Sequence, residues 1–350
     1  MLICIIERLR INPIISFTYF TMMFTAGGRR FVWNLFIIVL IFCILIIINT
    51  PQRMTPLPKQ VVGWEANITR ETKIYVVPEN DTSIISGRGI CKGSFDLIIV
   101  VFSAPENFAQ RNAIRETWGS YNTSNFRVAF LLGCSKNSTS QLLVEEENAE
   151  FQDLIQEDFI DSYNNLTVKS VMMLKWFLSK CPSPTLLMKT DDDMFINIEY
   201  LSALISKLSS HSVLIGTLIC KAKPILDATN KWYTPRYIYQ KPFYPNYVSG
   251  TGYLMSQDVA SKLYRAALST PLMHLEDVYL TGICAAKAGI TPRNHPGFSY
   301  EHFGIGCDTE MVTNHHLNPQ ELRQVWNMRN NCTTRIKPPT IKPKPLNPCH

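Results

Sequence analysis

The sequence predicts an α/β domain with a mostly parallel sheet and helices on both of its faces. Apolar runs over Phe95–Phe102, Phe126–Leu132 and Val213–Leu218 have the length and composition of buried strands. A further apolar run ends at Asp191, and the stretch Val168–Lys180 has helical periodicity. Because strands alternate with helices along the chain, the connections favour parallel neighbours covered on both sides.

The remaining elements complete this alternating pattern. Ser103–Glu106 matches a capping box with proline in the first turn, which predicts a helix that runs to about Trp118. A short strand is expected over Ile155–Ile160. Further helices are expected over Gln141–Gln156, over Ile198–Leu208, from Ser256 onward, and up to about Lys287.

Three consecutive acids, Asp191, Asp192 and Asp193, end the apolar strand that starts at Thr185. In open α/β sheets the carboxyl ends of strands face the ligand cleft, so we expect these acids there. A divalent cation relieves the repulsion between neighbouring carboxylates, and oxygen ligands suit Mg²⁺ or Mn²⁺. The alternative is a solvated acidic turn. A calcium loop is disfavoured because its alternating acids and its glycine are missing.

A second acidic pair, Glu276 and Asp277, stands at the predicted start of the last helix. Acids in this position usually cap a helix and interact favourably with its dipole. The functional alternative is that one of the two is a general base. The first acidic run makes this alternative attractive, since a cation site and a base together form a catalytic site.

The segment before the second acidic pair is rich in aromatic residues, among them Trp232 and Tyr244. Aromatic faces are suitable platforms for sugar rings, but packing in the core explains such residues equally well. Gly250 and Gly252 follow, and they permit either a close approach of the backbone or positive φ angles.

The N-terminal part has the composition of a membrane anchor followed by a stem. Residues 31–49 are uncharged and apolar, and about 20 such residues cross a bilayer. Arg29 and Arg30 precede the run, so residues 1–30 are expected in the cytosol and the remaining chain on the other side. A cleaved signal peptide is the alternative. Residues 50–90 are expected to form the stem, 91–332 the catalytic domain, and 333–350 a Pro- and Lys-rich tail.

Sequons and cysteines independently indicate the secretory pathway. Six Asn-x-Ser/Thr sequons stand at Asn67, Asn80, Asn122, Asn137, Asn165 and Asn331. Eight of the 10 cysteines lie beyond residue 90, which in an oxidising lumen suggests disulfides without fixing their pairing. The net charge of +6 is concentrated in the two ends, which carry +3 (1–30) and +4 (333–350), so the body carries −1. A near-neutral body argues against a nucleic-acid partner.

Several segments between about Phe95 and Trp326 form a recognisable set in colinear order. They are Arg111–Gly119, Glu150–Val168, Lys175-Trp176, Cys181, Met188–Asp193, Tyr244–Tyr253 and Glu276–Tyr279. This set resembles the β-1,3-glycosyltransferases, which include the β-1,3-galactosyltransferases. The resemblance implies a type II Golgi membrane protein with a GT-A fold, a UDP-sugar donor and a glycan acceptor.

The resemblance also assigns roles to individual residues. Asp193 would hold Mn²⁺ against the diphosphate of the donor, with His315 near the metal, and Asp277 would be the base. Asp191 or Asp192 would reach the ribose or the transferred sugar. Arg111 and Lys189 are candidates to face the nucleotide, with a structural ion pair as the alternative for each. Glu276, Trp232 and Tyr244 are assigned to the acceptor. The family often has a cysteine where Val248 stands, so a disulfide at that position is in doubt.

The expected activity is inverting transfer of galactose from UDP-galactose to the 3-hydroxyl of a GlcNAc- or GalNAc-ended glycan. UDP-GlcNAc or UDP-GalNAc as the donor is the first alternative, since nothing in the sequence decides between the sugars. An inactive relative that serves as a chaperone or binding module is the second. The retained acids at 191–193 and 277 favour an enzyme over the second alternative.

Overall fold

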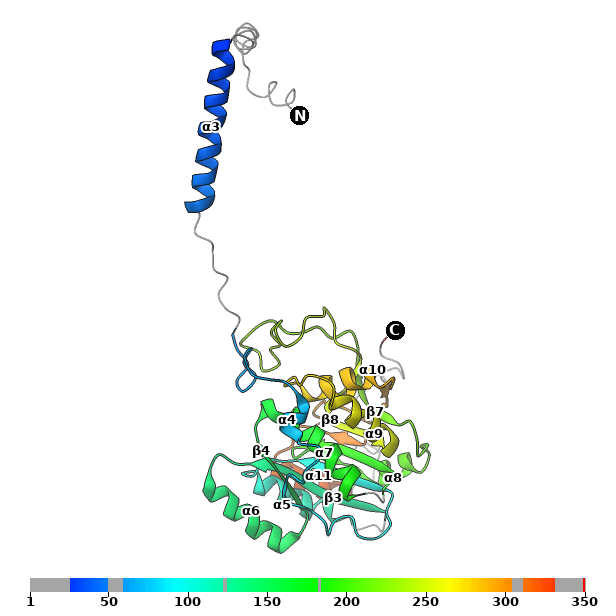
Figure 1. Ribbon diagram of the computed structural model, residues 1–350. Helices are drawn as coiled ribbons and strands as arrows, with labels where there is room; N and C mark the ends of the chain where they lie inside the picture. Colours follow the sequence, from blue (N-terminus) through cyan, green and yellow to red (C-terminus); the bar gives the residue numbers. More distant parts are fainter. Residues whose placement is uncertain are drawn as a thin grey trace. The chain divides into compact units, whose positions relative to one another are not determined.

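The computed structural model describes residues 26–49, 59–121, 125–181, 184–303, 311–330 and 349. The chain divides into two units, Met1–Pro58 and Lys59–His350 (Figure 1). In the first unit, helix α3 (Ala26–Asn49) covers the predicted anchor, and its described side chains, residues 30–46, are exposed. Among the residues that the structure describes, no helix is both long enough and apolar enough to pass through a membrane.

A mixed sheet forms the centre of the second unit, with the strand order β1-β4-β3-β2-β5-β8-β7-β9. Its strands are β1 (Ser83–Ile85), β2 (Leu97–Phe102), β3 (Phe126–Cys134), β4 (Leu154–Ile160), β5 (Leu186–Asp191), β7 (Leu214–Ile219), β8 (Tyr247–Ser256) and β9 (Arg293–Asn294). A separate pair joins β6 (Phe195–Ile196) to β10 (Thr313–Asn314). The predicted parallel arrangement is confirmed for β4-β3-β2-β5.

Strand β8 is the main element that the sequence did not predict. It runs antiparallel between β5 and β7, and places Tyr253 opposite Lys189 and Gly252 opposite Thr190. The Ser-Gly-Thr-Gly stretch of β8 argued against a strand at this position, because glycine is depleted in strands. By pairing with β5, this strand brings the glycine-containing stretch beside the acidic strand end.

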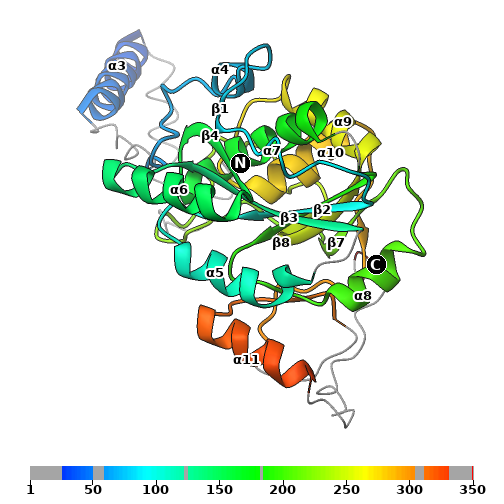
Figure 2. The ribbon, with the colours of Figure 1, turned by 90° about the horizontal axis from the view of Figure 1, so that it is seen from below.

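Helices cover both faces of the sheet, as predicted (Figure 2). One face carries α4 (Thr72–Val76), α7 (Leu166–Lys180), α9 (Gln257–Ala267), the π-helix η3 (Val278–Cys284) and α10 (Ala285–Lys287). The other carries α5 (Phe108–Glu116), α6 (Ser138–Phe151), α8 (Ile198–Ile205) and α11 (Pro319–Asn330). Short 3₁₀ helices occur at Trp118–Ser120 (η1) and Tyr163–Asn165 (η2). The fully buried strand β2 supplies both cores, because its alternate side chains point to opposite faces.

The predicted capping box at Ser103–Glu106 is wrong. Helix α5 begins at Phe108, with Asn107 at the N-cap position. The side chains expected to cap the helix have tertiary partners instead: Ser103 donates to Asp192, and Glu106 accepts from Ser135. Ser103 and Glu106 therefore form tertiary contacts in the folded chain in place of the local capping box.

The predicted stem over 50–90 extends too far, because residues 59–90 pack within the second unit. The Trp64 indole is 1% exposed and donates to the Asn164 carbonyl at 2.7 Å. Thr72 is also buried, and its hydroxyl donates to the Thr270 carbonyl at 2.8 Å. Only a few isolated apolar residues pack this segment against the domain. Because they are not regularly spaced, hydrophobic periodicity did not predict that the segment is folded.

Two disulfides are formed, Cys91–Cys181 and Cys220–Cys349. The second joins the end of β7 to the C-terminal tail. Among the described residues, Cys43, Cys134 and Cys284 are free, and Cys307 and Cys332 lie outside the described part. Val248, at the position where the resemblance raised the question of a cysteine, is fully buried in the core.

The described sequons are mostly accessible. Asn67, Asn80 and Asn137 are exposed. Asn165 is partly buried, and its Nδ2 donates to the Ile160 carbonyl at 2.8 Å. The predicted sites Asn122 and Asn331 lie outside the described residues.

Candidate active site

The three acids after β5 point to three different sets of partners. Asp191 Oδ1 accepts from the Lys189 ammonium at 2.6 Å. Asp192 Oδ2 accepts from Ser103 Oγ at 2.6 Å and from Asn107 Nδ2 at 2.8 Å. Asp193 turns towards two histidines that follow β10. Burial raises the pKa of both Asp191 and Asp192, against the opposing effect of these partners.

Asp193, His315 and His316 form a compact group with the chemistry of a cation site. One potential ligand atom from each lies within 4.8 Å of the other two. Asp193 Oδ2 is 3.3 Å from His315 Nε2 and 3.6 Å from His316 Nδ1, and the two rings stack at 3.7 Å. The other carboxylate oxygen, Asp193 Oδ1, is buried without a hydrogen-bond partner.

The surroundings of His315 make this group suitable for a metal. Its Nδ1 lies 2.9 Å from the Tyr300 carbonyl, which can only accept, so we assign the proton to Nδ1. A neutral ring then presents the lone pair of Nε2 to the Asp193 carboxylate, an arrangement that is stable only with a cation or a proton between them. Burial alone would lower the pKa of His315, but the hydrogen bond and charge of Asp193 raise it. Burial would raise the pKa of Asp193, and His315 and His316 lower it.

Lys189 lies beneath the site and does not face a cleft. Its side chain is 2% exposed, and its ammonium donates to Asp191 and to the Gly250 carbonyl. Burial would lower the pKa of Lys189, but Asp191 and Glu276 raise it. Of the two roles considered for Lys189, the structure therefore favours the structural ion pair over a contact with the nucleotide. Lys189 connects β5 to β8.

Asp277 is partly exposed and oriented by the backbone. Its Oδ2 accepts from the Gly250 amide at 3.1 Å, and its Oδ1 accepts from the Val278 amide at 2.8 Å. Burial raises the pKa of this carboxyl, and the two amides oppose the shift. Each oxygen keeps a lone pair for a further hydrogen bond. The capping and base interpretations are thus compatible, since one carboxylate meets both requirements.

The close approach of β8 explains the first of the two glycines. A Cβ at Gly250 would lie 3.0 Å from Glu276 Oε2 and 3.4 Å from Asp277 Cβ. The φ angles of Gly250 and Gly252 are not in the left-handed region. Of the two explanations left open by the sequence, close approach is therefore the one that holds for Gly250.

Glu276 points inward, away from any acceptor. It is 6% exposed, its Oε1 accepts from the Tyr253 hydroxyl at 2.6 Å, and its Oε2 is 4.0 Å from the Lys189 ammonium. Burial raises the pKa of Glu276 to about 7, and Lys189 opposes the shift. The prediction that Glu276 contacts the acceptor is wrong, because its carboxyl is enclosed by β5 and β8.

A continuous chain of contacts connects the two acidic regions. Asp191 bonds to Lys189, Lys189 bonds to the Gly250 carbonyl, and the Gly250 amide donates to Asp277. Asp193 lies two residues after Asp191 on the same turn. Asp277 is therefore linked through Lys189 and Gly250 to the acidic turn that carries Asp193.

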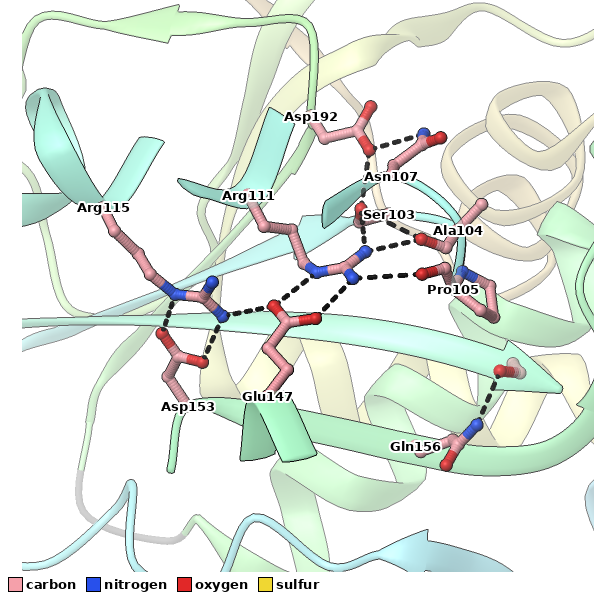
Figure 3. A network of polar contacts seen from close by, with 11 residues as sticks. Ser103, Ala104, Pro105, Asn107, Arg111, Arg115, Glu147, Asp153, Gln156 and Asp192 are labelled. Atoms are coloured by element: carbon pink, nitrogen blue, oxygen red, sulfur yellow. Dashed lines mark hydrogen bonds and ion pairs between the residues drawn. The ribbon is translucent and has the colours of Figure 1, made fainter. Parts of the chain in front are cut away.

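Arg111 is a structural residue, which corrects its expected contact with the donor (Figure 3). Its side chain is fully buried, and all five of its N–H donors are used within the protein. They go to Glu147 twice, to Ser103, and to the carbonyls of Ala104 and Pro105. Arg111 thus fixes the Ser103 hydroxyl that holds Asp192.

The two aromatic residues assigned to the acceptor behave differently. Tyr244 is 6% exposed and packs against Tyr239 and Tyr247, with ring centroids 4.9 and 6.4 Å away. Tyr244 therefore packs in the core, and the prediction that it binds the acceptor is wrong. Trp232 is 45% exposed, and its ring remains available to a ligand.

Four residues of the site had no role assigned from the sequence. Ser103 and Asn107 orient Asp192. The sequence did not reveal this role, because Ser103 was interpreted as part of a capping box. His316, the neighbour of His315 in sequence, also lies at Asp193. Tyr163, in the segment Glu150–Val168, is 48% exposed, and burial of the rest of its side chain and the charge of Asp277 raise its pKa.

Comparisons with known proteins identify the family of the chain. The galactosyltransferase family model matches residues 109–296. β-1,3-Galactosyltransferase 1 from Mus musculus and from Homo sapiens is 39% identical over 239 residues, covering 66% of this chain and 73% of the relative. β-1,3-Galactosyltransferase 2 from Homo sapiens is 36% identical over 247 residues, covering 66% of this chain and 58% of that protein.

Solved structures resemble the chain only weakly. The 4-diphosphocytidyl-2C-methyl-D-erythritol synthase of Anaerococcus prevotii aligns at 11% identity and a TM-score of 0.36, covering 59% of this chain and 88% of that one. Mouse xyloside xylosyltransferase 1 aligns at 11% identity and a TM-score of 0.33, covering 64% and 97%. From the family model and the curated relatives, the chain belongs to the galactosyltransferase family, as a hexosyltransferase of the β-1,3-galactosyltransferase type.

Proposed function

We propose that the protein transfers galactose from UDP-galactose to the 3-hydroxyl of a GlcNAc- or GalNAc-ended glycan, with inversion, in a domain of GT-A type. One observation carries the proposal. The cation group around Asp193 and the available carboxylate of Asp277 are joined through Lys189 and Gly250 in a single site. Such a pairing suits a reaction in which a diphosphate leaves while a hydroxyl attacks.

Asp193, His315 and His316 are the residues that would hold Mn²⁺. The orphaned Asp193 Oδ1 and the lone pair of His315 Nε2 support this assignment, and a carboxylate with imidazoles accommodates Mn²⁺. When bound, the metal would stabilise negative charge on the leaving diphosphate. Asp191, whose side chain is 33% exposed, is placed to accept hydrogen bonds from sugar hydroxyls of the donor.

Asp277 would act as the general base on the acceptor. Its two backbone amide donors fix the plane of the carboxylate, and burial raises its pKa, which makes it a stronger base. The carboxylate takes the proton of the 3-hydroxyl while that oxygen forms the new bond to the sugar and UDP departs. A single displacement inverts an α-linked donor into a β product, so a second catalytic carboxylate is not required.

We also propose a Golgi location with a type II topology. Residues 1–30 would be cytosolic and residues 31–49 would form the anchor, supported by the apolar sequence and the two arginines before it. Residues 50–58 would then begin a short stem. The described sequons and the two disulfides suit a luminal domain.

A donor panel tests the proposal. The purified enzyme with Mn²⁺ is incubated with UDP-galactose, UDP-GlcNAc or UDP-GalNAc and with GlcNAc-, GalNAc- or Gal-ended acceptors, and the product linkage is read by NMR. A β-1,3-linked galactose is the expected product. Transfer of another sugar would establish the alternative donors. Glycan binding without transfer or hydrolysis of any donor would leave the binding module as the explanation.

A further inference from the structure

A basic loop precedes the strand that carries Gly250. The loop, Cys220–Asn246, runs from the end of β7 to the start of β8 and is the yellow-green coil of Figure 1. Its cations are Lys221, Lys223, Lys231, Arg236 and Lys241, all exposed, against the single acid Asp227. The loop thus carries +4, whereas the rest of the body, residues 31–219 and 247–332, carries −5.

The cations of the basic loop are not neutralised within the fold. In the part of the chain that the structure describes, none of the five makes a salt bridge. Two of them lie over aromatic rings instead: Lys231 is 4.5 Å from the Trp232 ring centroid and Lys223 is 5.3 Å from that of Phe243. Both rings are 45% exposed. Each pair presents an apolar face and a positive charge side by side.

Arg70 fixes the basic loop to the segment that leads into Asp277. Its Nη1 donates to the carbonyls of Ile238 at 3.0 Å and Leu272 at 3.1 Å, and its Nη2 donates to that of Tyr237 at 3.3 Å. The Leu272 amide in turn donates to the Arg70 carbonyl at 2.8 Å. Because Leu272 precedes Asp277 by only five residues, the loop is held in a fixed relation to the proposed base.

Tyr163 provides a second link between the loop and the site. Burial of the phenol and the charge of Asp277 raise the pKa of Tyr163, whereas the Trp232 side chain lowers it. Trp232 and Asp277 therefore have a common neighbour.

We propose that the basic loop selects acceptor glycans that carry a sulfate or carboxylate group near the sugar that receives galactose. The inference rests on the proposed transfer reaction and specifies its acceptor. Exposed rings bind the C–H faces of sugars, and the adjacent ammonium groups bind an acidic substituent. An acidic lipid surface would also attract cations, but the ring pairs and the link to the Asp277 segment favour a glycan.

The test measures acceptor binding and transfer separately. Full-length enzyme with UDP and Mn²⁺ is titrated calorimetrically with a GlcNAc-ended disaccharide and with its 6-O-sulfated and glucuronate-bearing counterparts. We expect about tenfold tighter binding of the acidic glycans, as two or three exposed charge pairs would give. The preference should shrink between about 0.1 M and about 1 M NaCl, as the Debye length falls from about 10 Å to about 3 Å.

Charge-neutralised variants provide the matched comparison. Combined Lys223→Gln, Lys231→Gln and Arg236→Gln should bring the ratio of acidic to neutral affinity close to one. The control combines Lys92→Gln, Lys136→Gln and Lys207→Gln, which removes the same charge from exposed positions outside the loop and should keep the ratio. Circular dichroism melting of both variants confirms that they fold.

Three results would overturn the inference: equal affinity for neutral and acidic glycans, an unchanged ratio in the loop variant, or an equal loss in the control. If the loop variant lost binding to phosphatidylserine vesicles while keeping the ratio, the loop would be a membrane contact and the inference would fail. If the acidic preference appeared without galactose transfer to any acceptor, the inference would stand and the proposed function would fall.

Discussion

The acidic run after β5 and the acidic pair before η3 look alike in sequence but differ in how their carboxylates are used. After β5, Asp191 and Asp192 are tied to Lys189, Ser103 and Asn107, and Asp193 alone faces the histidines. Before η3, Glu276 is enclosed with Tyr253. Its neighbour Asp277 is held only by two backbone amides and remains open.

In each run one carboxylate, Asp193 or Asp277, is the one that the proposed function uses, and its neighbours have partners within the fold. Where carboxylates stand together, each buried charge requires a cation or a hydrogen bond. Asp191, Asp192 and Glu276 take such partners from other elements of the fold. Asp193 faces two histidines, and the oxygens of Asp277 accept from backbone amides. Four comparisons, which use six substitutions, test this division of roles.

The largest effect is expected from Asp277→Asn. The amide keeps the shape of the side chain but cannot take a proton, so kcat for transfer should fall by about 10²- to 10⁴-fold. Calorimetric binding of UDP with Mn²⁺ should stay near the wild-type value. A variant that transfers normally, or one that loses nucleotide binding instead, would remove Asp277 from the role of base.

The next largest effect separates two neighbouring acids after β5. Asp193→Asn should weaken Mn²⁺ binding by at least about a hundredfold, since even the loss of a ligand's outer partner costs 10- to 100-fold. Asp192→Asn should mainly lower the free energy of unfolding, by about 1–3 kcal/mol, because the hydrogen bonds of Ser103 and Asn107 to a charged acceptor are weakened.

Manganese titration of activity and urea unfolding of both variants provide the readouts. Equal metal dependence of Asp193→Asn and the wild type would contradict the assigned cation site. A larger metal defect in Asp192→Asn than in Asp193→Asn would reverse the roles of the two acids.

Alanine substitutions of the two glycines on β8 form a matched pair, for which we expect an intermediate effect on kcat. Gly250→Ala places a Cβ 3.0 Å from Glu276 Oε2 and should displace the second acidic pair, lowering kcat by about tenfold to a hundredfold. Gly252→Ala places its Cβ 3.4 Å from Thr313, an ordinary contact, and should change kcat by less than about threefold. Steady-state kinetics and melting temperatures are compared, and similar kinetics for the two variants would refute the close-approach explanation.

The smallest effect is a change in pH dependence from Glu276→Gln. Because the pKa of Glu276 rises from 4.5 to about 7 on folding, the folded protein binds more protons than the unfolded chain between these values. The free energy of unfolding should therefore fall as pH rises through this window, by at most about 3 kcal/mol, and stay low above pH 7. Urea unfolding of the variant should lack this slope, and an unchanged slope would mean that Glu276 is ionised in the fold.

Several elements were predictable because their signals are local. The runs that became β2, β3, β5 and β7 are rich in apolar residues, as expected for strands that are covered on both faces. Strand β8 was not predictable in this way, because it contains two glycines, and Gly250 is explained only by the carboxylates beside it. Residues 59–77 were mistaken for a stem because their few buried side chains, such as Trp64, have no regular spacing.

The sequence by itself determined the family, the alternating α/β pattern and the two acidic regions. Composition and order along the chain encode these features. Only the tertiary structure decided which acids remain available, that Arg111 and Lys189 are internal, and that Arg70 holds the basic loop near Asp277. The physical reason is that a charged group takes the nearest partner in space. That partner often comes from a distant part of the chain, as Glu147 does for Arg111 and Gly250 for Lys189.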